Sequence, residues 1–319
     1  MPEIKPRIAL ISPMFNEEGN IAIFISKATE IFQAIGLTPL FILVDDGSKD
    51  GTAHAALSNL DKCIDSRVIE LSRNFGKEAA ILAGIDESVA LNVDAAILID
   101  SDLQHPLEAI PTLIHSWQAG NDVVIAARAS RITDPLARRL LTRLFYRAIN
   151  FLSDVQINDG EGDFRLMSAA VLRAISELRE CHRFTKGLYS WVGFKQDRFY
   201  IEYAERTDGR SNFGLKSLVS LALNAVTSFS AKPLALALFL GTLIGLIAFL
   251  YGIWIAISTL WFGNAVPGYA SLFCGMMFIG GLQLTCIGLI GEYIGRIFIQ
   301  TKLRPPYIRR KISIIGGHE

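Results

Sequence analysis

Two carboxylates one residue apart, Asp100 and Asp102, directly follow the apolar run AAILI. Carboxylate oxygens are hard ligands that suit Mg²⁺ or Mn²⁺, and such an ion would in turn bind a diphosphate. A metal ion there neutralises charge on a departing nucleotide, which is Lewis-acid catalysis. We therefore predict a divalent metal site at Asp100 and Asp102, with an ordinary surface turn as the alternative interpretation.

Two further polar clusters also follow apolar runs. Asp45 and Asp46 follow FILV, and the segment 13–18 follows the first apolar run of the chain. The functional interpretation places one carboxylate against the base or ribose of a nucleotide, with Phe15 as a packing surface and Glu17 as an acceptor. The alternatives are a β-turn for the first cluster and a helix N-terminus for the second.

The elements that must position these side chains are short apolar strands that alternate with stretches of helical spacing. The expected strands are 8–12, 40–44, 68–71, 95–99 and 123–126, and the expected helices are 20–35, 52–60, 77–89 and 106–118. This alternation is typical of βαβ units and predicts an α/β fold with a mostly parallel sheet. Ligands bind at the carboxyl ends of such strands, which is where the three polar clusters fall.

The last third of the chain is apolar enough to cross a membrane. Between residues 234 and 294 the only formally charged residue is Glu292, and the connector 261–268 divides this stretch. Each half is long enough for the ~20 residues that cross a bilayer core. Trp254, Trp261 and Tyr269 flank the connector, as aromatic residues do at membrane interfaces. We predict a transmembrane hairpin over 233–298.

Basic residues predict the orientation of this hairpin. Lys232 precedes the first span, and the second is followed by Arg296, Lys302, Arg304, Arg309, Arg310 and Lys311. By the positive-inside rule, both ends face the cytoplasm, which makes the chain a multi-pass protein of the inner (plasma) membrane. The first apolar run is too short for a signal peptide, so we expect the N-terminus to stay cytoplasmic. The formal net charge is zero, which gives no electrostatic reason to expect a nucleic acid partner.

The remaining segments complete the expected domain organisation. Residues 1–212 form the cytoplasmic catalytic domain, 213–232 a juxtamembrane helix, and 299–319 a basic cytoplasmic tail. Within the first of these, 135–152 carries arginines at helical spacing between apolar residues, which indicates a helix lying at the membrane surface. An ordinary domain helix with a solvated basic face is the alternative.

Five motifs in order resemble glycosyltransferase family 2: FNEE, VDDGSKDGT, LSRNFGKEAAILAG, LIDSDLQHP and GDFRLM. Within that family the chain resembles the polyprenyl-phosphate glycosyltransferases, which include relatives of dolichyl-phosphate mannose synthase. The motifs cover about residues 8–215. The two-helix tail with Arg304-Pro305-Pro306-Tyr307 resembles the bacterial branch that makes polyprenyl-phosphate glucose. The resemblance implies a GT-A fold, which is a Rossmann-like nucleotide-binding sheet.

The resemblance also implies a donor site. Asp100 and Asp102 are implied to bind the metal ion and, through it, the diphosphate. Gly84 is implied to allow close packing of the helix that contains it. The residues implied in binding the nucleotide sugar are Pro13, Phe15, Glu17, Asp45, Asp46, Arg73, Lys77, Asp100, Gln104, Arg206 and Ser211. Two positions depart from the family pattern: His105 stands where many relatives carry Asp, and Asn212 replaces the lysine of an R-x-x-G-x-S-K-Y loop.

For the acceptor, the resemblance implies that Arg165 grips a lipid phosphate, with Arg147 as the second arginine and Arg143 on the same predicted helix. Arginine suits phosphate because its planar fork bonds two oxygens. Asp163 resembles the proposed base, with Asp159 and Glu161 as competitors. An alkyl phosphate has a second pKa near ~6, so most of it is already a dianion at neutral pH. We therefore expect Asp163 to orient Arg165 and the acceptor rather than to remove a proton.

These features predict an inverting, metal-dependent transfer of a hexosyl group, with UDP-glucose as the donor implied by resemblance and undecaprenyl phosphate as the acceptor. A processive polysaccharide synthase is an alternative, but the chain has no Q-x-x-R-W motif. A non-catalytic nucleotide-binding membrane subunit is another, although both motif carboxylates are intact. Polar Gln283 and Glu292 within the second span predict self-association into a homo-oligomer.

Overall fold

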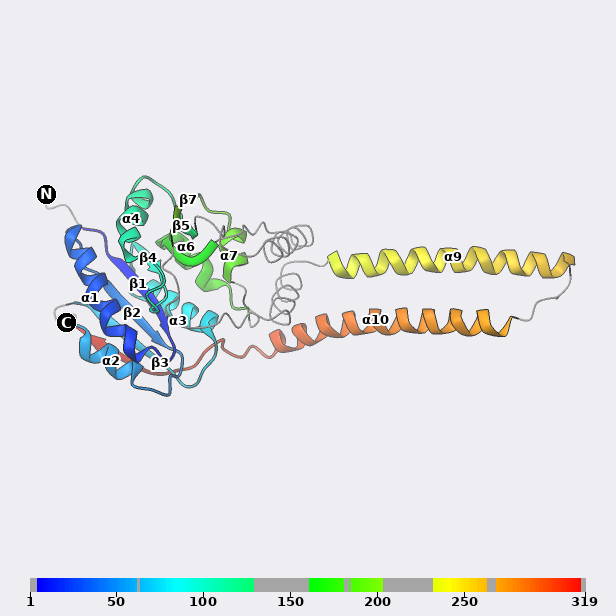
Figure 1. Ribbon diagram of the computed structural model, residues 1–319, viewed down its shortest axis with the longest axis horizontal. Coiled ribbons are helices and arrows are strands. Elements are labelled where there is room, and N and C mark those ends of the chain that lie inside the picture. Colours follow the sequence, from blue (N-terminus) through cyan, green and yellow to red (C-terminus); the bar gives the residue numbers. More distant parts are fainter. Residues whose placement is uncertain are drawn as a thin grey trace.

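The computed structural model describes residues 5–61, 64–128, 161–180, 183, 185–202, 232–262 and 268–316. Figure 1 shows an α/β domain, to which the first and last described strands belong, and two long helices that project from it side by side. The predicted surface helix 135–152 lies outside the described residues, and so does the predicted juxtamembrane helix 213–232 except for Lys232.

One mixed sheet forms the centre of the α/β domain. Within the described residues it has eight strands in the order β7-β5-β6-β4-β1-β2-β3-β8. Strands β4, β1, β2 and β3 are parallel, β6 is antiparallel to both β4 and β5, and β8 is antiparallel to β3. The strands are β1 (Ile8–Met14), β2 (Leu40–Asp45), β3 (Ser66–Leu71), β4 (Ala95–Leu98), β5 (Val123–Arg128), β6 (Glu161–Ser168), β7 (Gln196–Ile201) and β8 (Arg309–Ile315).

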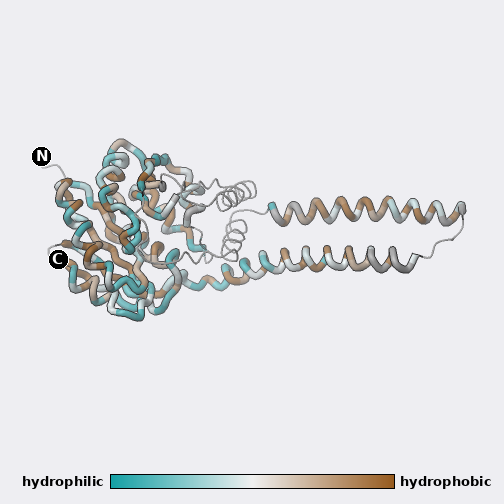
Figure 2. Tube along the Cα trace, viewed as in Figure 1, coloured by the Kyte–Doolittle hydropathy of each residue, from teal (hydrophilic) through white to brown (hydrophobic). Residues whose placement is uncertain are grey.

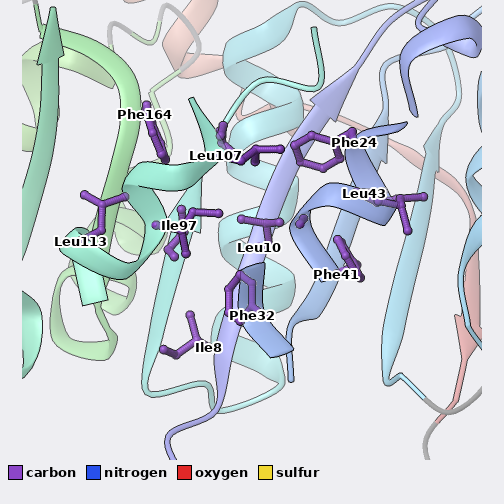
Figure 3. Close-up of a cluster of buried hydrophobic side chains, with 14 of the residues drawn as sticks. Ile8, Leu10, Phe24, Phe32, Phe41, Leu43, Ile97, Leu107, Leu113 and Phe164 are labelled. Carbon is purple, nitrogen blue, oxygen red and sulfur yellow. The ribbon is translucent and has the colours of Figure 1, made fainter. Parts of the chain in front are cut away.

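Helices cover both faces of the sheet, because successive strand residues point to opposite faces. Ile8 and Leu10 of β1 belong to one buried cluster, whereas Ala9 and Ile11 belong to another. The first cluster packs under α1 (Glu18–Ala34), α2 (Thr52–Asn59), the 3-10 turn η1 (Leu107–Ala109) and α4 (Ile110–Gln118). The second packs under α3 (Lys77–Ala90), α6 (Ala169–Glu177) and α7 (Thr185–Trp191). Figure 3 shows Phe24, Phe32 and Phe41 of the first cluster around Leu10.

Burial on both faces explains why the central strands have nearly continuous apolar sequences. The five strands and four helices expected from alternation are all present, with bounds that differ by a few residues. Strands β6, β7 and β8 and helices α6 and α7 were not expected from the sequence. Strand β6 contains the whole GDFRLM motif, and β8 lies in the segment expected to be a basic tail.

The two long helices are α9 (Lys232–Phe262) and α10 (Tyr269–Thr301). They contain apolar stretches long enough to cross a membrane, Ala237–Ile255 and Gly275–Thr301. Their large apolar side chains, such as Leu238, Phe249 and Trp254, are mostly exposed, and Figure 2 shows apolar residues along the length of α9. Apolar surface on this scale is unfavourable in water and favourable inside a bilayer. The hairpin therefore indicates that the protein associates with a membrane.

Gly84 lies where α3 crosses the sheet. A Cβ atom at this position would stand 2.4 Å from Cγ2 of Ile11, which is closer than real Cβ contacts. The absence of a side chain therefore lets α3 approach β1, and this close packing fixes the helix that begins beside the carboxyl ends of the strands.

Replacing Gly84 with alanine should lower the free energy of unfolding by about 1–3 kcal/mol, because the added methyl group must displace Ile11 or the helix. The measurement is thermal or urea unfolding in detergent. Gly19→Ala in α1 is the matched control, because nothing lies within 4 Å of its added Cβ. Equal stability of Gly84→Ala and the wild type would contradict the packing argument.

Candidate active site

A cavity of about 310 Å³ lies at the carboxyl ends of β1, β2 and β4. The three polar clusters singled out in the sequence meet at this edge of the sheet, as the rule for parallel strands predicts. The lining residues are Pro13, Met14, Phe15 and Glu17 after β1, Asp46 after β2, Asn74, Gly76 and Lys77 before and at the start of α3, and Asp100, Ser101 and Asp102 after β4.

Lys77 connects the two sides of the site. Its Nζ atom lies 2.7 Å from Oδ2 of Asp100 and 2.6 Å from Oδ2 of Asp163. Asp100 follows β4, and Asp163 belongs to β6, which pairs with β4. A single ammonium group therefore holds carboxylates from two neighbouring strands, and it joins the metal motif to the residue that resembles the family base.

The charges of this cluster reinforce one another. Burial alone would raise the pKa of Asp100, but a hydrogen bond with His105 and the Lys77 ammonium outweigh that effect and lower it. Burial alone would likewise lower the pKa of Lys77, but Asp163 and Asp100 raise it above the usual lysine value. Lys77 is therefore a cation and Asp100 an anion throughout the neutral pH range.

His105 is a buried neighbour of the Asp100 carboxylate. Its Nε2 atom lies 3.7 Å from Oδ2 of Asp100, its side chain is 9% exposed, and its ring packs against Phe164 of β6 with a centroid separation of 5.4 Å. The sequence left the role of this departure from the family pattern open. The structure places it as a buried neighbour of the first metal-motif carboxylate.

Asp46 organises the loop that leads to Lys77. Its two carboxylate oxygens accept hydrogen bonds from the backbone N–H groups of Phe75 at 2.7 Å and Gly76 at 2.9 Å. Burial raises the pKa of Asp46, and these two bonds only partly offset that rise. Gly47 has a φ of +69°, and a Cβ there would lie 2.5 Å from the backbone of Arg73. The turn after β2 therefore packs directly against the loop before α3.

Asp45 and Arg73 do not line the cavity. The Asp45 carboxylate is buried and accepts hydrogen bonds from the backbone N–H and the hydroxyl of Ser48. The Arg73 guanidinium stacks 4.0 Å over the ring of Phe75 and donates to the carbonyl of Asn74. Both residues therefore shape the loops around the cavity in this structure.

The loop after β1 forms the opposite wall. Phe15 is 42% exposed beside the cavity, and Glu17 accepts a hydrogen bond from Asn20 Nδ2 at 2.7 Å. Burial is the largest effect on the pKa of Glu17 and raises it, and the nearby Asp102 and Asp100 carboxylates act in the same direction. The cavity thus concentrates negative charge that a cation would relieve.

The carboxylates at Asp100 and Asp102 fit a magnesium-like ion. Among the described residues, no group of three or more His, Cys, Asp or Glu side chains is arranged to hold a metal. Mg²⁺ typically uses only one or two carboxylates and completes its shell with phosphate oxygens and water. Asp102 is further oriented by the backbone N–H of Gln104, which donates to its Oδ1 at 3.1 Å.

Arg165 is in the interior of the domain. It is 1% exposed, its guanidinium stacks 3.9 Å over the ring of Tyr189, and it donates to the carbonyl of Gly162 at 2.6 Å. It lies two residues from Asp163 on β6, and therefore on the same face of that strand. The stack on Tyr189 fixes the plane of the guanidinium, and its N–H groups point outward within that plane.

The structure thus brings Asp100, Lys77 and Asp163 together, with Asp46 and Asp102 beside them. Met14, Gly76 and Ser101 line the cavity without having been singled out, and Tyr189 carries no motif that could have identified it. Five predicted site residues lie outside the described residues: Arg143, Arg147, Asp159, Arg206 and Ser211.

Family models match both parts of the chain. The model for "Glycosyl transferase family 2" matches residues 9–176, and that for "GtrB C-terminal hairpin" matches residues 232–297. The chain belongs to glycosyltransferase family 2. The GT-A fold expected from the motifs and the two-helix hairpin are confirmed, and the protein is a glycosyltransferase.

Several relatives of this family 2 glycosyltransferase share nearly its full length. A prophage bactoprenol glucosyl transferase homolog from Escherichia coli K12 is 43% identical over 96% of this chain and 99% of its own. The bactoprenol glucosyl transferase of Shigella phage SfII is 44% identical over 96% of this chain and 98% of its own. A solved glucosyl-3-phosphoglycerate synthase from Mycobacterium tuberculosis matches at 20% identity over 70% of this chain and 78% of its own, with a TM-score of 0.44, too distant a likeness to assign any residue.

Replacing Asp46 with asparagine should loosen the loop before Lys77, because an amide NH₂ cannot accept the bond that one carboxylate oxygen now receives. We expect the free energy of unfolding to fall by about 1–3 kcal/mol. Hydrogen exchange in a peptide that covers residues 72–80 should also become faster. Glu177→Gln, exposed on α6, is the control, and unchanged exchange in Asp46→Asn would contradict the role assigned to Asp46.

Proposed function

We propose that this enzyme transfers glucose from UDP-glucose to a polyprenyl (undecaprenyl) phosphate at the cytoplasmic face of the membrane, with inversion of the anomeric carbon. The observation that carries the proposal is the near-complete match, across both the α/β domain and the hairpin, to relatives described as bactoprenol glucosyl transferases. Bactoprenol is a polyprenol, so these names describe a lipid acceptor. The exposed apolar hairpin supplies the membrane contact that such an acceptor requires.

On the donor side, we assign the diphosphate and the metal to Asp100 and Asp102, which line the cavity together. Mg²⁺ or Mn²⁺ bound there supplies Lewis-acid stabilisation of the charge on the departing diphosphate. Pro13, Phe15 and Glu17 form the wall proposed to hold the nucleoside. The other residues proposed to act on the nucleotide sugar, directly or through the loops they hold, are Asp45, Asp46, Arg73, Lys77, Gln104, Arg206 and Ser211.

Lys77 has a proposed role that goes beyond contact with the nucleotide. Its ammonium screens the repulsion between Asp100 and Asp163, so the carboxylates on the donor and acceptor sides can lie close to one another. Lys77 thus acts by positioning these groups. When the nucleophile is already ionised, positioning and charge stabilisation contribute most of the rate enhancement. The raised pKa of Lys77 keeps this ammonium charged during the reaction.

The acceptor phosphate needs little activation, because a second pKa near ~6 leaves it mostly dianionic at neutral pH. One of its oxygens bonds to the anomeric carbon while the bond from that carbon to the diphosphate oxygen breaks, which inverts the centre. Asp163, already paired with Lys77, orients the acceptor side in this proposal. Asp159 and Glu161 remain the competing candidates for a base.

Arg143 and Arg147 are the arginines proposed to meet the acceptor phosphate at the membrane surface. Arg165, buried and stacked on Tyr189, is the third arginine proposed for the same contact. We further propose that the catalytic domain and both chain ends lie in the cytoplasm, that the hairpin crosses the inner membrane twice, and that the protein forms a homo-oligomer. A periplasmic location for either end, found by labelling of added cysteines, would contradict this topology.

The function is tested by incubating the purified full-length protein with undecaprenyl phosphate, Mg²⁺ or Mn²⁺, and radiolabelled UDP-glucose, UDP-galactose, UDP-N-acetylglucosamine or GDP-mannose. We expect organic-soluble label from UDP-glucose only, and a β-linked product. Asp102→Asn should lower this transfer by at least about a hundredfold, because it removes one charged metal ligand.

Glu30→Gln, exposed on α1, is the matched carboxylate control and should transfer at the wild-type rate. Membrane insertion of Asp102→Asn should be unchanged. Incorporation of label into a glycan chain would favour a polysaccharide synthase. Absence of transfer from every donor would favour a nucleotide-binding subunit, and wild-type turnover by Asp102→Asn would refute the metal assignment.

A further inference from the structure

The chain re-enters the catalytic domain directly after the second membrane helix. The return segment, residues 302–316, ends in β8, which pairs antiparallel with β3 from Leu71↔Arg309 to Ser66↔Ile315. The backbone N–H of Ser72 also donates to the carbonyl of Ile308 at 2.9 Å. Figure 1 shows this segment running from the end of α10 along the outer edge of the sheet. The segment is therefore part of the domain that contains the active site.

Asp86 of α3 is the centre of the contacts made at this re-entry. Its side chain is 10% exposed, and its oxygens accept hydrogen bonds from Arg179 Nη1 at 2.6 Å and Nη2 at 3.0 Å. The hydroxyl of Tyr307 in the return segment donates to the same carboxylate. The side-chain amide of Gln300, in the last turn of α10, donates to the carbonyl of Arg179 at 3.2 Å. These four residues, which we name the Asp86 junction, join the membrane helix to α3.

A second link lies one residue further along α3. Arg309 Nη1 is 3.1 Å from Oε2 of Glu87, and Arg309 Nη2 donates to the Tyr307 hydroxyl at 3.2 Å. The Glu87 side chain is 11% exposed, so its charge is largely removed from water. The return segment thus contacts two consecutive carboxylates of α3, Asp86 through the Tyr307 hydroxyl and Glu87 through the Arg309 guanidinium.

The opposite end of α3 carries Lys77. Asp86 lies nine residues after Lys77, which corresponds to a rise of about 14 Å along the helix axis. The segment between them packs in the core, with Ala80, Ile81, Leu82, Ala83 and Ile85 fully buried, so α3 behaves as a rigid rod. A displacement of about 1 Å along this rod moves the base of the Lys77 side chain by the same amount relative to Asp100 and Asp163, whose contacts with its ammonium are 2.7 Å and 2.6 Å.

We propose that Asp86 and Tyr307 are positioning residues for sugar transfer. By fixing the far end of α3 against the membrane helix and the return segment, they keep the Lys77 ammonium between the two active-site carboxylates. The hairpin then does more than anchor the enzyme, because its end sets the geometry of the active site. The kinetic part of this inference rests on the proposed function, and the structural part does not.

Tyr307→Phe tests the inference, because it removes one hydroxyl while the ring keeps its place against the core beneath α3. We expect faster hydrogen exchange in peptides that cover residues 77–90 and a fall in kcat of about tenfold, the loss that corresponds to one hydrogen bond to a charged group. Asp86→Asn should act in the same direction. Lys311→Ala is the matched control on β8, since Lys311 is 60% exposed and its ion-pair partner, at 4.0 Å, is Glu70 of β3; it should change neither quantity.

A double-mutant cycle separates positioning from general stability. If Tyr307 acts through Lys77, Tyr307→Phe should change kcat less than about twofold when Lys77 is already replaced by glutamine. Additive losses, or exchange in residues 77–90 equal to that of the wild type, would overturn the inference. If the wild-type protein transfers no glucose to undecaprenyl phosphate, the proposed function fails, and the exchange measurement still decides whether the Asp86 junction holds α3.

Discussion

The ammonium group of Lys77, shared by Asp100 and Asp163, is the interaction on which the rest of the site depends. Two partly buried carboxylates on neighbouring strands repel each other unless a cation lies between them. The structure supplies that cation from the first residue of α3 and fixes it from several directions. Asp46 sets the loop before it, Gly84 lets its helix pack against β1, and the return segment holds the far end of the same helix.

This arrangement suits a reaction between a water-soluble donor and an acceptor confined to a bilayer. The cavity proposed to hold the donor lies at the carboxyl ends of the parallel strands, where Asp100 and Asp102 line it. Asp163 comes from β6, the antiparallel strand inserted beside β4. Lys77 therefore lies at the boundary between the proposed donor and acceptor sides. The return segment that follows the second hairpin helix contacts the far end of α3, so one rigid element joins the anchor to the proposed chemistry.

Much of this could be predicted from the sequence, because local patterns encode it. Alternating apolar runs predicted β1 to β5 and their helices, and motif order predicted the family, the fold and the residues around the cavity. The contact between Lys77 and Asp163 could not be predicted, since it depends on β6 inserting between β4 and β5 across more than 80 residues of chain. Burial of Arg165 on Tyr189 and the pairing of β8 with β3 are also long-range packing outcomes that no local period reports.

The most direct test of the account is the turnover of Lys77→Gln compared with Lys77→Arg, using UDP-glucose and undecaprenyl phosphate as substrates. We expect Lys77→Gln to lower kcat by about 10²–10³-fold, because the substitution removes a preorganised charge from the centre of the site. Lys77→Arg, which keeps the charge, should retain more of the activity, and both variants should remain folded in the membrane. A Lys77→Gln enzyme that turns over within about twofold of the wild type would contradict the central claim.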